Sequence, residues 1–227
     1  MRVILFGATG MVGQGALREC VLDPQVTAVL SVVRRESGPS LGRRSEKVRE
    51  LVTNDFYNLT QFAGEFAGYD ACLFCLGVSS LGMKEAEYRR VTYDLTMAAA
   101  QAVLRVNPTS SSGGMTFVYV SGAGTDATGR SMWARVKGET ENALLGMGFK
   151  AAYMFRPGMI VPLHGITSKT KLYQTMYTVL KPLLPLLLRW FPAQVNTTEQ
   201  VGRAMLAVAK HGYAKPVLDP ADIARVG

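Results

Sequence analysis

Hydrophobic positions along the chain fall into short continuous runs separated by longer stretches with helical spacing. Val3–Phe6 is one such run, and it is typical of a strand buried on both faces of a parallel sheet. Further strands and helices are expected to alternate with it. The expected strands are Ala28–Val33, Val48–Val52, Ala71–Leu76, Thr116–Val120 and Ala151–Phe155, and the expected helices are Met11–Leu22, Asn58–Phe66, Glu85–Arg105, Arg130–Met147 and Thr197–Lys210.

This alternation predicts an α/β fold, a Rossmann-type doubly wound parallel sheet with helices on both faces. A ligand is expected beyond the carboxyl ends of the strands, where the strand order reverses. A length of 227 residues suits one domain, so we expect a single domain over residues 1–227. The composition changes after Arg156-Pro157-Gly158, and residues 159–227 are expected to cover the substrate side of the sheet.

Composition narrows the class of protein. With 48% hydrophobic and 19% charged residues, the chain can bury a large core and does not resemble a disordered protein. The formal net charge of +8 suits an anionic ligand or an acidic membrane surface. The basic residues are scattered and have no aromatic residues interleaved, so nucleic-acid binding is not expected.

Three cysteines cannot form a disulfide framework. Cys72 and Cys75 have the spacing of a redox pair, but both lie in an apolar run that predicts a buried strand. Residues three apart on a strand face opposite sides of the sheet, which disfavours a disulfide. The chain enters structure directly from Met1, without room for a signal peptide. These features predict a cytoplasmic protein.

A glycine-rich turn follows the first strand and opens the first helix. Gly7 permits the tight turn, Gly10 lets backbone N–H groups approach a pyrophosphate, and Gly13 lets the helix pack closely on the strand. The helix N-terminus adds partial positive charge beneath the phosphates. The sequence therefore predicts a dinucleotide site at Gly7, Thr9, Gly10, Met11, Val12 and Gly13.

The end of the second strand bears on the choice of cofactor. NAD-specific sites have an acidic residue there, which binds the ribose 2′-hydroxyl, whereas this chain has Arg34 and Arg35 followed by Glu36. A guanidinium can pair with a 2′-phosphate and stack on adenine. NADP(H) is therefore favoured over NAD(H). The alternatives are that the arginines are solvated loop charge, or that Glu36 contacts the ribose.

These motifs, in this order, resemble the short-chain dehydrogenase/reductase superfamily. More narrowly, the chain resembles its atypical branch, which contains the TIP30-like and NAD(P)-binding epimerase-like proteins. The resemblance covers about residues 1–160. It rests on the glycine turn, Asn54-Asp55-Phe56, Cys75-Leu76-Gly77, Val118-Tyr119-Val120-Ser121 and Arg156-Pro157-Gly158.

The resemblance implies roles for individual residues. Asp55 and Phe56 would lie near the adenine, and Leu76 and Gly77 along the ribose and phosphate. Thr92 would lie on the long helix behind the cofactor. Ser121 would polarise a substrate carbonyl, and Lys137 would hold the nicotinamide ribose. The backbone that faces the nicotinamide would belong to Pro157, Gly158 and Ile160.

The chain departs from the superfamily at its catalytic signature, Tyr-x-x-x-Lys, because Trp133 stands four residues before Lys137. The spacing still places both side chains on one helical face. In the superfamily the lysine lowers the tyrosine pKa so that the phenol can transfer a proton. An indole N–H only donates and does not titrate usefully, so Trp133 can position or stack but cannot replace that acid.

Three interpretations of this position stay open. The protein could be an NADP-dependent oxidoreductase in which Ser121, a water or another tyrosine (Tyr93, Tyr153 or Tyr173) donates the proton. It could instead bind the cofactor without catalysis, as a redox-state sensor or regulator. In the third, Ser121, Trp133 and Lys137 are remnants with no common role. We favour an oxidoreductase acting on a carbonyl or hydroxyl of a small apolar substrate.

The C-terminal third leaves the question of partners open. Basic residues flank the apolar stretch at residues 177–191, which either walls the substrate pocket or makes weak peripheral contact with a membrane. The prolines within it leave it short of a membrane-spanning helix. His164 and His211 have no partners at metal-ligand spacing, so no metal is expected. The long helices Glu85–Arg105 and Arg130–Met147 could pair in a homodimer.

Overall fold

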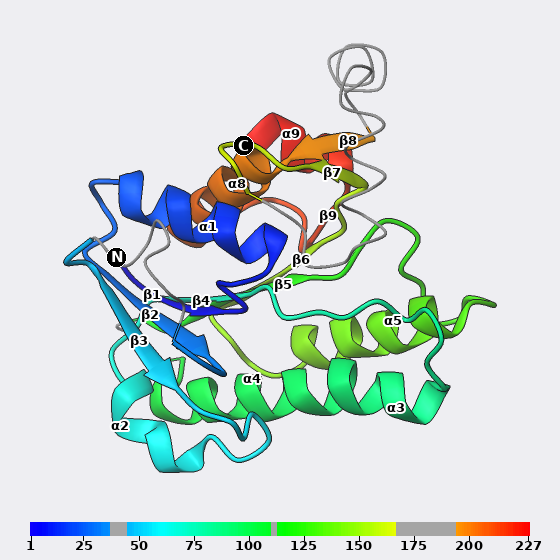
Figure 1. Ribbon diagram of the computed structural model, residues 1–227, viewed down its shortest axis with the longest axis horizontal. Coiled ribbons are helices and arrows are strands. Elements are labelled where there is room, and N and C mark those ends of the chain that lie inside the picture. The colour runs from blue at the N-terminus through cyan, green and yellow to red at the C-terminus, as the bar shows by residue number, and fades with distance from the viewer. Residues whose placement is uncertain (37–44, 110–112, 167–193) are drawn as a thin grey trace.

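The computed structural model describes residues 1–36, 45–109, 113–166 and 194–227 (Figure 1). Its centre is a seven-stranded sheet of order β3-β2-β1-β4-β5-β6-β9, in which every neighbouring pair is parallel. The predicted Rossmann-like doubly wound fold is confirmed. The strands are β1 (Arg2–Phe6), β2 (Ala28–Val33), β3 (Val48–Val52), β4 (Ala71–Phe74), β5 (Thr116–Val120), β6 (Ala151–Phe155) and β9 (Val217–Leu218).

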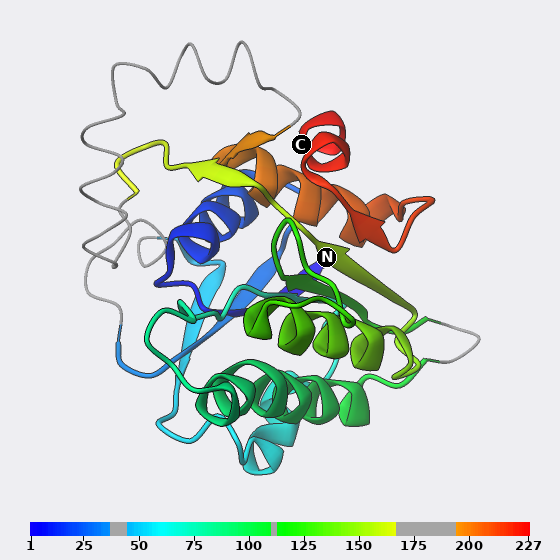
Figure 2. The same cartoon turned by 90° about the vertical axis from the view of Figure 1, so that its right-hand side faces the viewer.

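Helices cover both faces of this sheet, as Figures 1 and 2 show from two directions. One layer contains α1 (Met11–Leu22), α8 (Thr198–His211) and α9 (Pro220–Val226). The opposite layer contains α2 (Ala63–Phe66), α4 (Leu95–Val106) and α5 (Met132–Leu145). The helix that ends in α4 begins as α3 (Glu85–Arg89) and passes through the π-helical turn η2 (Arg90–Asp94).

Burial on both faces explains the continuous apolar runs. Val3 and Leu5 of β1 pack toward α1 and α8, whereas Ile4 and Phe6 pack toward α4. Phe6 lies 5.5 Å from Phe74 of β4, ring centroid to centroid, within a cluster of aromatic rings. Because each strand has apolar side chains on both faces, the sheet is held between two separate hydrophobic cores.

The strand order reverses between β1 and β4, and the glycine turn lies at this point. Gly7 has a positive φ of 84°. A Cβ on it would lie 2.7 Å from the backbone atoms Cys75 C and Leu76 N. A Cβ on Gly13 would lie 2.0 Å from the Gly7 carbonyl oxygen. Both positions exclude any side chain, because real Cβ atoms do not approach backbone this closely, and the turn leaves a cleft at the carboxyl ends of the strands.

Several elements differ from the sequence-based expectation. The strand expected over Ala71–Leu76 ends at Phe74, since the chain turns into the cleft after Cys75. The helix expected over Asn58–Phe66 is a 3₁₀ turn η1 (Thr60–Phe62) followed by α2. Asp55 explains the late start, because its carboxylate accepts hydrogen bonds from the N–H groups of Tyr57 and Asn58 and holds a turn there.

The C-terminal region contributes elements that the sequence analysis did not predict. β7 (Met159–Val161) and β8 (Val195–Thr197) form a small parallel sheet, and β9 extends the main sheet beside β6. The expected helix at Thr197–Lys210 is confirmed as α8 with Thr197 as its cap, whose hydroxyl accepts a hydrogen bond from Gln200 N at 3.0 Å. Residues 167–193, including the apolar stretch 177–191, lie outside the described residues.

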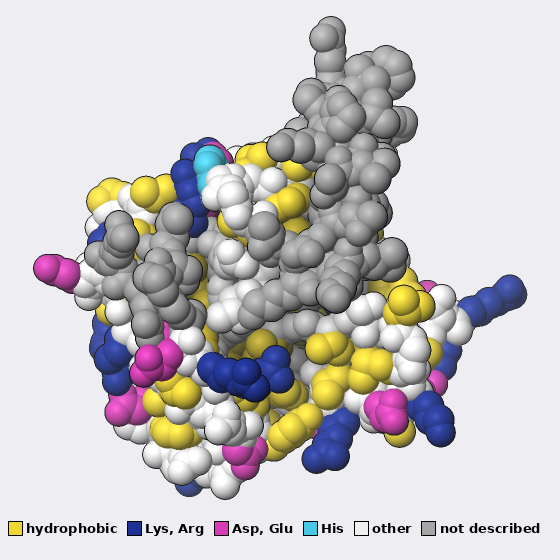
Figure 3. Space-filling model, viewed as in Figure 1, with side chains coloured by type: hydrophobic (Ala, Val, Ile, Leu, Met, Phe, Trp, Pro, Cys, Tyr) yellow, Lys and Arg dark blue, Asp and Glu magenta, His cyan; other side chains and the backbone are white. Residues whose placement is uncertain are grey.

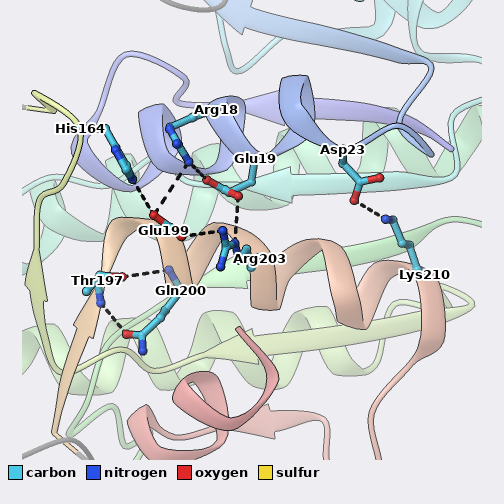
Figure 4. A network of polar contacts seen from close by, with 9 residues as sticks. All are labelled: Arg18, Glu19, Asp23, His164, Thr197, Glu199, Gln200, Arg203 and Lys210. Atoms are coloured by element: carbon cyan, nitrogen blue, oxygen red, sulfur yellow. Dashed lines mark hydrogen bonds and ion pairs between the residues drawn. The ribbon is translucent and has the colours of Figure 1, made fainter.

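α1 and α8 cross closely, and charged side chains bind them along the contact (Figure 4). The buried carboxylate of Glu19 in α1 accepts hydrogen bonds from Arg18 and from Arg203 of α8. Glu199 pairs with Arg203 at 2.6 Å and with Nε2 of His164 at 2.5 Å. The hydrogen bond from His164 is the largest cause that holds the pKa of Glu199 below its usual value. The network fixes α8 against the helix that carries the glycine turn.

We expect Gly15→Ala to lower the free energy of unfolding by about 1–3 kcal/mol, the usual effect of overpacking. A Cβ on Gly15 would lie 2.5 Å from the Thr198 carbonyl oxygen, so α1 and α8 must separate. Chemical denaturation measures the change. Gly64→Ala in α2 is the matched control, because nothing lies within 4 Å of its Cβ position. Equal unfolding free energies for both variants and the wild type would contradict the close packing of the two helices.

Candidate functional site

The larger part of the candidate site is a cleft of about 670 Å³ beside the glycine turn, referred to below as the adenine-side cleft. Gly7 and Thr9 line one wall, and the end of β2 with the following Arg34 and Arg35 lines another. Phe56, which follows β3, contributes an aromatic side chain. The remaining lining residues are Val32, Val33, Glu36, Asn54 and Leu76.

A second cleft, of about 470 Å³, lies on the other side of the turn and shares Leu76 with the first; we call it the reaction-side cleft. The first turn of α1, the loop after β4, the end of β5, and α5 all contribute to it. The structure thereby brings together residues that lie far apart in the sequence. Of the predicted site residues, it contains Gly10, Met11, Val12, Leu76, Gly77, Ser121, Lys137, Pro157, Gly158 and Ile160.

The backbone between the two clefts fits a pyrophosphate. The Cβ position of Gly10 has a single neighbour within 4 Å, the Gly7 carbonyl oxygen at 3.4 Å, so the turn is open toward the clefts. Within α1, the N-cap Gly10 provides no side-chain hydrogen bond and the first turn contains no acidic residue. The N–H groups of this first turn have no partner inside the helix and can bind an anion.

Positive charge lies on this side of the molecule. In the space-filling view, a compact group of Lys and Arg side chains occupies the centre of the face, close to where the arrowheads of β1 and β2 end in Figure 1 (Figure 3). Arg34 and Arg35 are exposed residues of the adenine-side cleft. A dinucleotide bound along both clefts would therefore place its phosphates in a positive potential.

The segment after β3 is arranged differently from what the resemblance implies. Phe56 lines the adenine-side cleft and is 5% exposed, because its ring also packs on Phe6 with centroids 6.3 Å apart. The Asp55 carboxylate binds the N–H groups of the following turn, and Asn54 is the polar residue of this segment that lines the cleft. The sequence analysis did not identify Asn54 as a site residue, although it belongs to the motif that carried the resemblance.

Ser121 directly follows β5 and lines the reaction-side cleft, and its hydroxyl is hydrogen-bonded within the protein. The hydroxyl donates to Oε1 of Glu141 at 2.5 Å and lies 3.1 Å from the Phe155 carbonyl oxygen. Glu141 is 2% exposed and also accepts from Arg156, whose Nε–Oε1 and Nη2–Oε2 distances are 3.0 and 2.5 Å. The role implied for Ser121, polarising a substrate carbonyl, would require this hydroxyl to leave Glu141. The sequence analysis overlooked Glu141, which lies one helical turn beyond Lys137.

Lys137 reaches the reaction-side cleft from α5. Its ammonium donates a hydrogen bond to the Ser121 carbonyl oxygen, so the lysine is anchored to the end of β5. Burial lowers the pKa of Lys137 to about 8, and the negative charge of Glu141 opposes that shift. A lysine in this state can be either charged or neutral near physiological pH.

The indole of Trp133 lies on the same side of α5, one turn before Lys137. Its Cη2 atom is 3.4 Å from the position that a Cβ on Gly124 would occupy, so the ring packs against the loop after β5. Trp133 is not among the described residues that line the reaction-side cleft.

Two of the three tyrosines considered as alternative proton donors, Tyr93 and Tyr153, are not among the described residues that line the reaction-side cleft. Tyr93 lies under the Arg89 guanidinium, 4.7 Å from ring centroid to Cζ. The Tyr153 hydroxyl accepts from the Tyr213 N–H at 2.9 Å, within the core shared by α8 and α9. Tyr173 lies outside the described residues. Thr92 is buried in η2, and its carbonyl oxygen accepts a hydrogen bond from the Thr96 hydroxyl at 2.5 Å.

The structure also bears on the cysteine pair, on a possible metal site and on a possible membrane-spanning helix. Cys72 and Cys75 are free cysteines, and burial raises the pKa of both thiols. In the described part of the chain, no group of three or more His, Cys, Asp or Glu side chains is placed to hold a metal ion. No helix in those same ranges is both long and apolar enough to cross a membrane.

The chain is similar in sequence to several known proteins. No protein-family model matches the chain. It is 27% identical over 164 residues to the protein fmp52, mitochondrial, of Emericella nidulans, covering 70% of this chain and 66% of that one. It is 29% identical over 174 residues to FMP52 of Saccharomyces cerevisiae, covering 75% and 69%. Protein HTATIP2 of Rattus norvegicus is 26% identical over 159 residues, covering 70% of this chain and 62% of that one. The matches to these three relatives therefore span about two thirds of the relatives' own length.

The names of the FMP52 relatives correct one expectation. The cytoplasmic location inferred from the sequence is wrong, because these similar proteins from several fungi are named mitochondrial. The inference used only the cysteine content and the residues after Met1, and neither observation distinguishes one reducing compartment from another.

Solved structures share the fold. A dTDP-glucose 4,6-dehydratase from Streptomyces venezuelae, with NAD and TYD bound, has a TM-score of 0.67 at 16% identity over 100% of this chain and 80% of its own. A short-chain dehydrogenase/reductase from Saccharomyces cerevisiae has a TM-score of 0.66 at 16% identity, and the match covers 99% of this chain and 98% of that one. A UDP-glucose 4-epimerase has a TM-score of 0.68 at 13% identity over 99% and 80%. The chain therefore has the fold of the short-chain dehydrogenases/reductases and epimerases, and its sequence is similar to HTATIP2 and FMP52, which is consistent with an atypical member of the TIP30-like branch.

Proposed function

We propose that the chain binds NADP(H) along the two clefts and acts as an oxidoreductase on a carbonyl or hydroxyl group of a small apolar substrate. The observation that carries this proposal is the shared lining of the adenine-side cleft, where Arg34 and Arg35 face the same cavity as the glycine turn. A nucleotide whose pyrophosphate lies on that turn has its adenosine ribose near the end of β2. A guanidinium at this place pairs with a 2′-phosphate.

The chain's own residues would hold the cofactor in four places. The first turn of α1 would bind the pyrophosphate, and Phe56 and Asn54 would lie beside the adenine. Lys137 would bind the nicotinamide ribose, and the backbone at Pro157 and Gly158 would face the nicotinamide. When bound, the reduced cofactor supplies hydride to the substrate.

The reaction-side cleft supports the substrate class. Its lining is mostly small or apolar, with side chains from the first turn of α1, the loop after β4 and the end of β5. Val78 of this lining is 50% exposed. Apolar surface of this kind favours an apolar substrate, because burying it excludes water from both partners.

Titration with NADPH and NADH by calorimetry tests the cofactor assignment. Arg34→Ala combined with Arg35→Ala is expected to weaken NADPH binding by about 1–3 kcal/mol, the usual range for lost charge-assisted hydrogen bonds. NADH binding should hardly change, because NADH has no 2′-phosphate. Equal losses for both nucleotides would contradict the assignment, and absence of binding to the folded wild type would remove the proposed function itself.

A matched control distinguishes ion pairing between Arg34 or Arg35 and the 2′-phosphate from general attraction of the nucleotide by the protein's net positive charge. Arg130→Ala with Arg225→Ala removes the same positive charge from exposed residues that do not line either cleft. This control should leave the preference for NADPH unchanged. A similar loss of NADPH affinity in the control variant would mean that net charge alone is responsible.

A second candidate function is a non-catalytic NADP(H)-dependent regulator. Two observations favour it: an indole stands where the superfamily has its catalytic tyrosine, and the Ser121 hydroxyl is bound to Glu141. In that case the cofactor would be retained as a signal of redox state.

Trp133→Tyr distinguishes the two candidates. A phenol one helical turn before Lys137 would restore the proton donor that the superfamily uses, so NADPH-dependent reduction of a panel of small carbonyl compounds should rise at least tenfold if the geometry is otherwise catalytic. Trp133→Phe is the control, because it changes the ring but adds no hydroxyl. The regulator is favoured if the tyrosine variant binds NADPH as the wild type does and gains no turnover.

A further inference from the structure

Among the described residues that line the reaction-side cleft, very few side chains can exchange a proton. Among its described lining residues, the titratable side chains are those of Lys137 and Cys75. Burial raises the pKa of the Cys75 thiol far above its usual value, so that thiol stays protonated and is a poor acid. Trp133 cannot replace the tyrosine, and the Ser121 hydroxyl is directed toward Glu141. This leaves Lys137 as the group suited to proton exchange.

A single buried carboxylate controls the surroundings of Lys137. Glu141 lies one turn further along α5 and is 2% exposed. It binds the Ser121 hydroxyl, and the Ser121 carbonyl oxygen in turn accepts from the Lys137 ammonium. It also binds Arg156 through both carboxylate oxygens, which ties the end of β6 to the same centre. Glu141 therefore links the chain after β5 to the chain after β6 directly, and it is connected to Lys137 through Ser121.

We propose that Lys137 Nζ is the proton donor and acceptor of this site in place of the missing tyrosine, and that Glu141 is the positioning residue that holds Lys137 and sets its charge. During reduction of a carbonyl to a hydroxyl, Nζ gives one proton to the substrate oxygen and becomes a neutral amine, which solvent reprotonates. The carbonyl carbon receives its hydride from the reduced nicotinamide. The inference rests on the proposed function for the reaction, but the titration of Lys137 does not depend on it.

The charged groups around Lys137 determine in which direction each substitution should shift its pKa. The carboxylate of Glu141 favours the ammonium, and burial favours the neutral amine. Arg156 faces Glu141 from β6, and the buried Tyr119 faces it from β5. Arg135 and Glu139, on the outer side of α5, are paired with Glu85 and Arg89 of α3. The groups that set the Lys137 charge are therefore Glu141 and, through it, Arg156.

Nuclear magnetic resonance on the cofactor-free full chain, with 13C-labelled lysine side chains, tests the titration directly. Lys137→Arg identifies the signal by removing it. We expect this lysine to titrate near pH 8, against about 10.4 for an unperturbed lysine. A value of 10 or above would overturn the proposal, whether or not the protein binds NADPH.

Two variants that should shift the pKa of Lys137 in opposite directions test the role of Glu141. Glu141→Gln keeps the shape but removes the negative charge, so the pKa of Lys137 should fall by roughly one unit or more. Arg156→Gln removes the positive charge opposite Glu141, so the pKa of Lys137 should rise. Glu139→Gln is the matched control on the same helix and should have no effect, because its partner Arg89 lies on the outer surface. If Glu141→Gln does not fold, the Arg156→Gln titration still decides the sign, and an unchanged pKa in a folded variant would overturn the positioning role.

The donor role has its own test in the pH profile of NADPH-dependent carbonyl reduction. The rate, measured as kcat/KM, should fall as the pH rises through about 8, because the neutral amine has no proton to give. In Glu141→Gln this fall should shift to lower pH by the same amount as the titration of Lys137. A profile that does not follow the titration, or NADPH binding without any turnover, would overturn the donor role while leaving the cofactor assignment intact.

Discussion

The close approach of bare backbone at the glycine turn is the constraint on which the rest of the site depends. Gly7 lies against the backbone of Cys75 and Leu76, Gly13 against Gly7, and Gly15 against α8, each at a distance that excludes a Cβ. These contacts bring β1, β4, α1 and α8 together at the point where the strand order reverses. The two clefts lie on either side of this point, and the first turn of α1 leaves N–H groups there without a partner inside the helix.

The second constraint is electrostatic, and it acts at the ends of β5 and β6. A carboxylate as buried as that of Glu141 is stable only when it is paired and hydrogen-bonded, and Arg156 and Ser121 meet this requirement. The pairing has a consequence for chemistry. Once the Ser121 hydroxyl satisfies Glu141, it is not directed toward a substrate, although it stands on the strand that carries this role in the superfamily.

Much of the fold could be predicted from periodicity, because strands buried on both faces appear as apolar runs, and the hydroxyl residues at Thr197-Thr198 before Glu199 indicate the start of α8. The short strands β7, β8 and β9 could not, since two or three residues carry no periodicity. The glycine turn and Lys137 were found because they belong to motifs of fixed spacing. Glu141 was missed because, in the sequence, a buried carboxylate cannot be distinguished from ordinary surface charge on a helix. Only the fold places Arg156, which follows β6, beside it.

If Trp133 stands where the resembling superfamily has its tyrosine, as we propose, a different group must titrate. With a tyrosine present, a lysine one turn away serves best as a permanent cation that lowers the phenol pKa. Without it, a permanent cation would have nothing to activate. A lysine whose pKa lies near 8 can instead give up a proton itself, and burial together with an offsetting carboxylate produces such a value. In the proposed role, the side chains that anchor Lys137 on this helix would therefore also provide an acid at the cleft without a tyrosine.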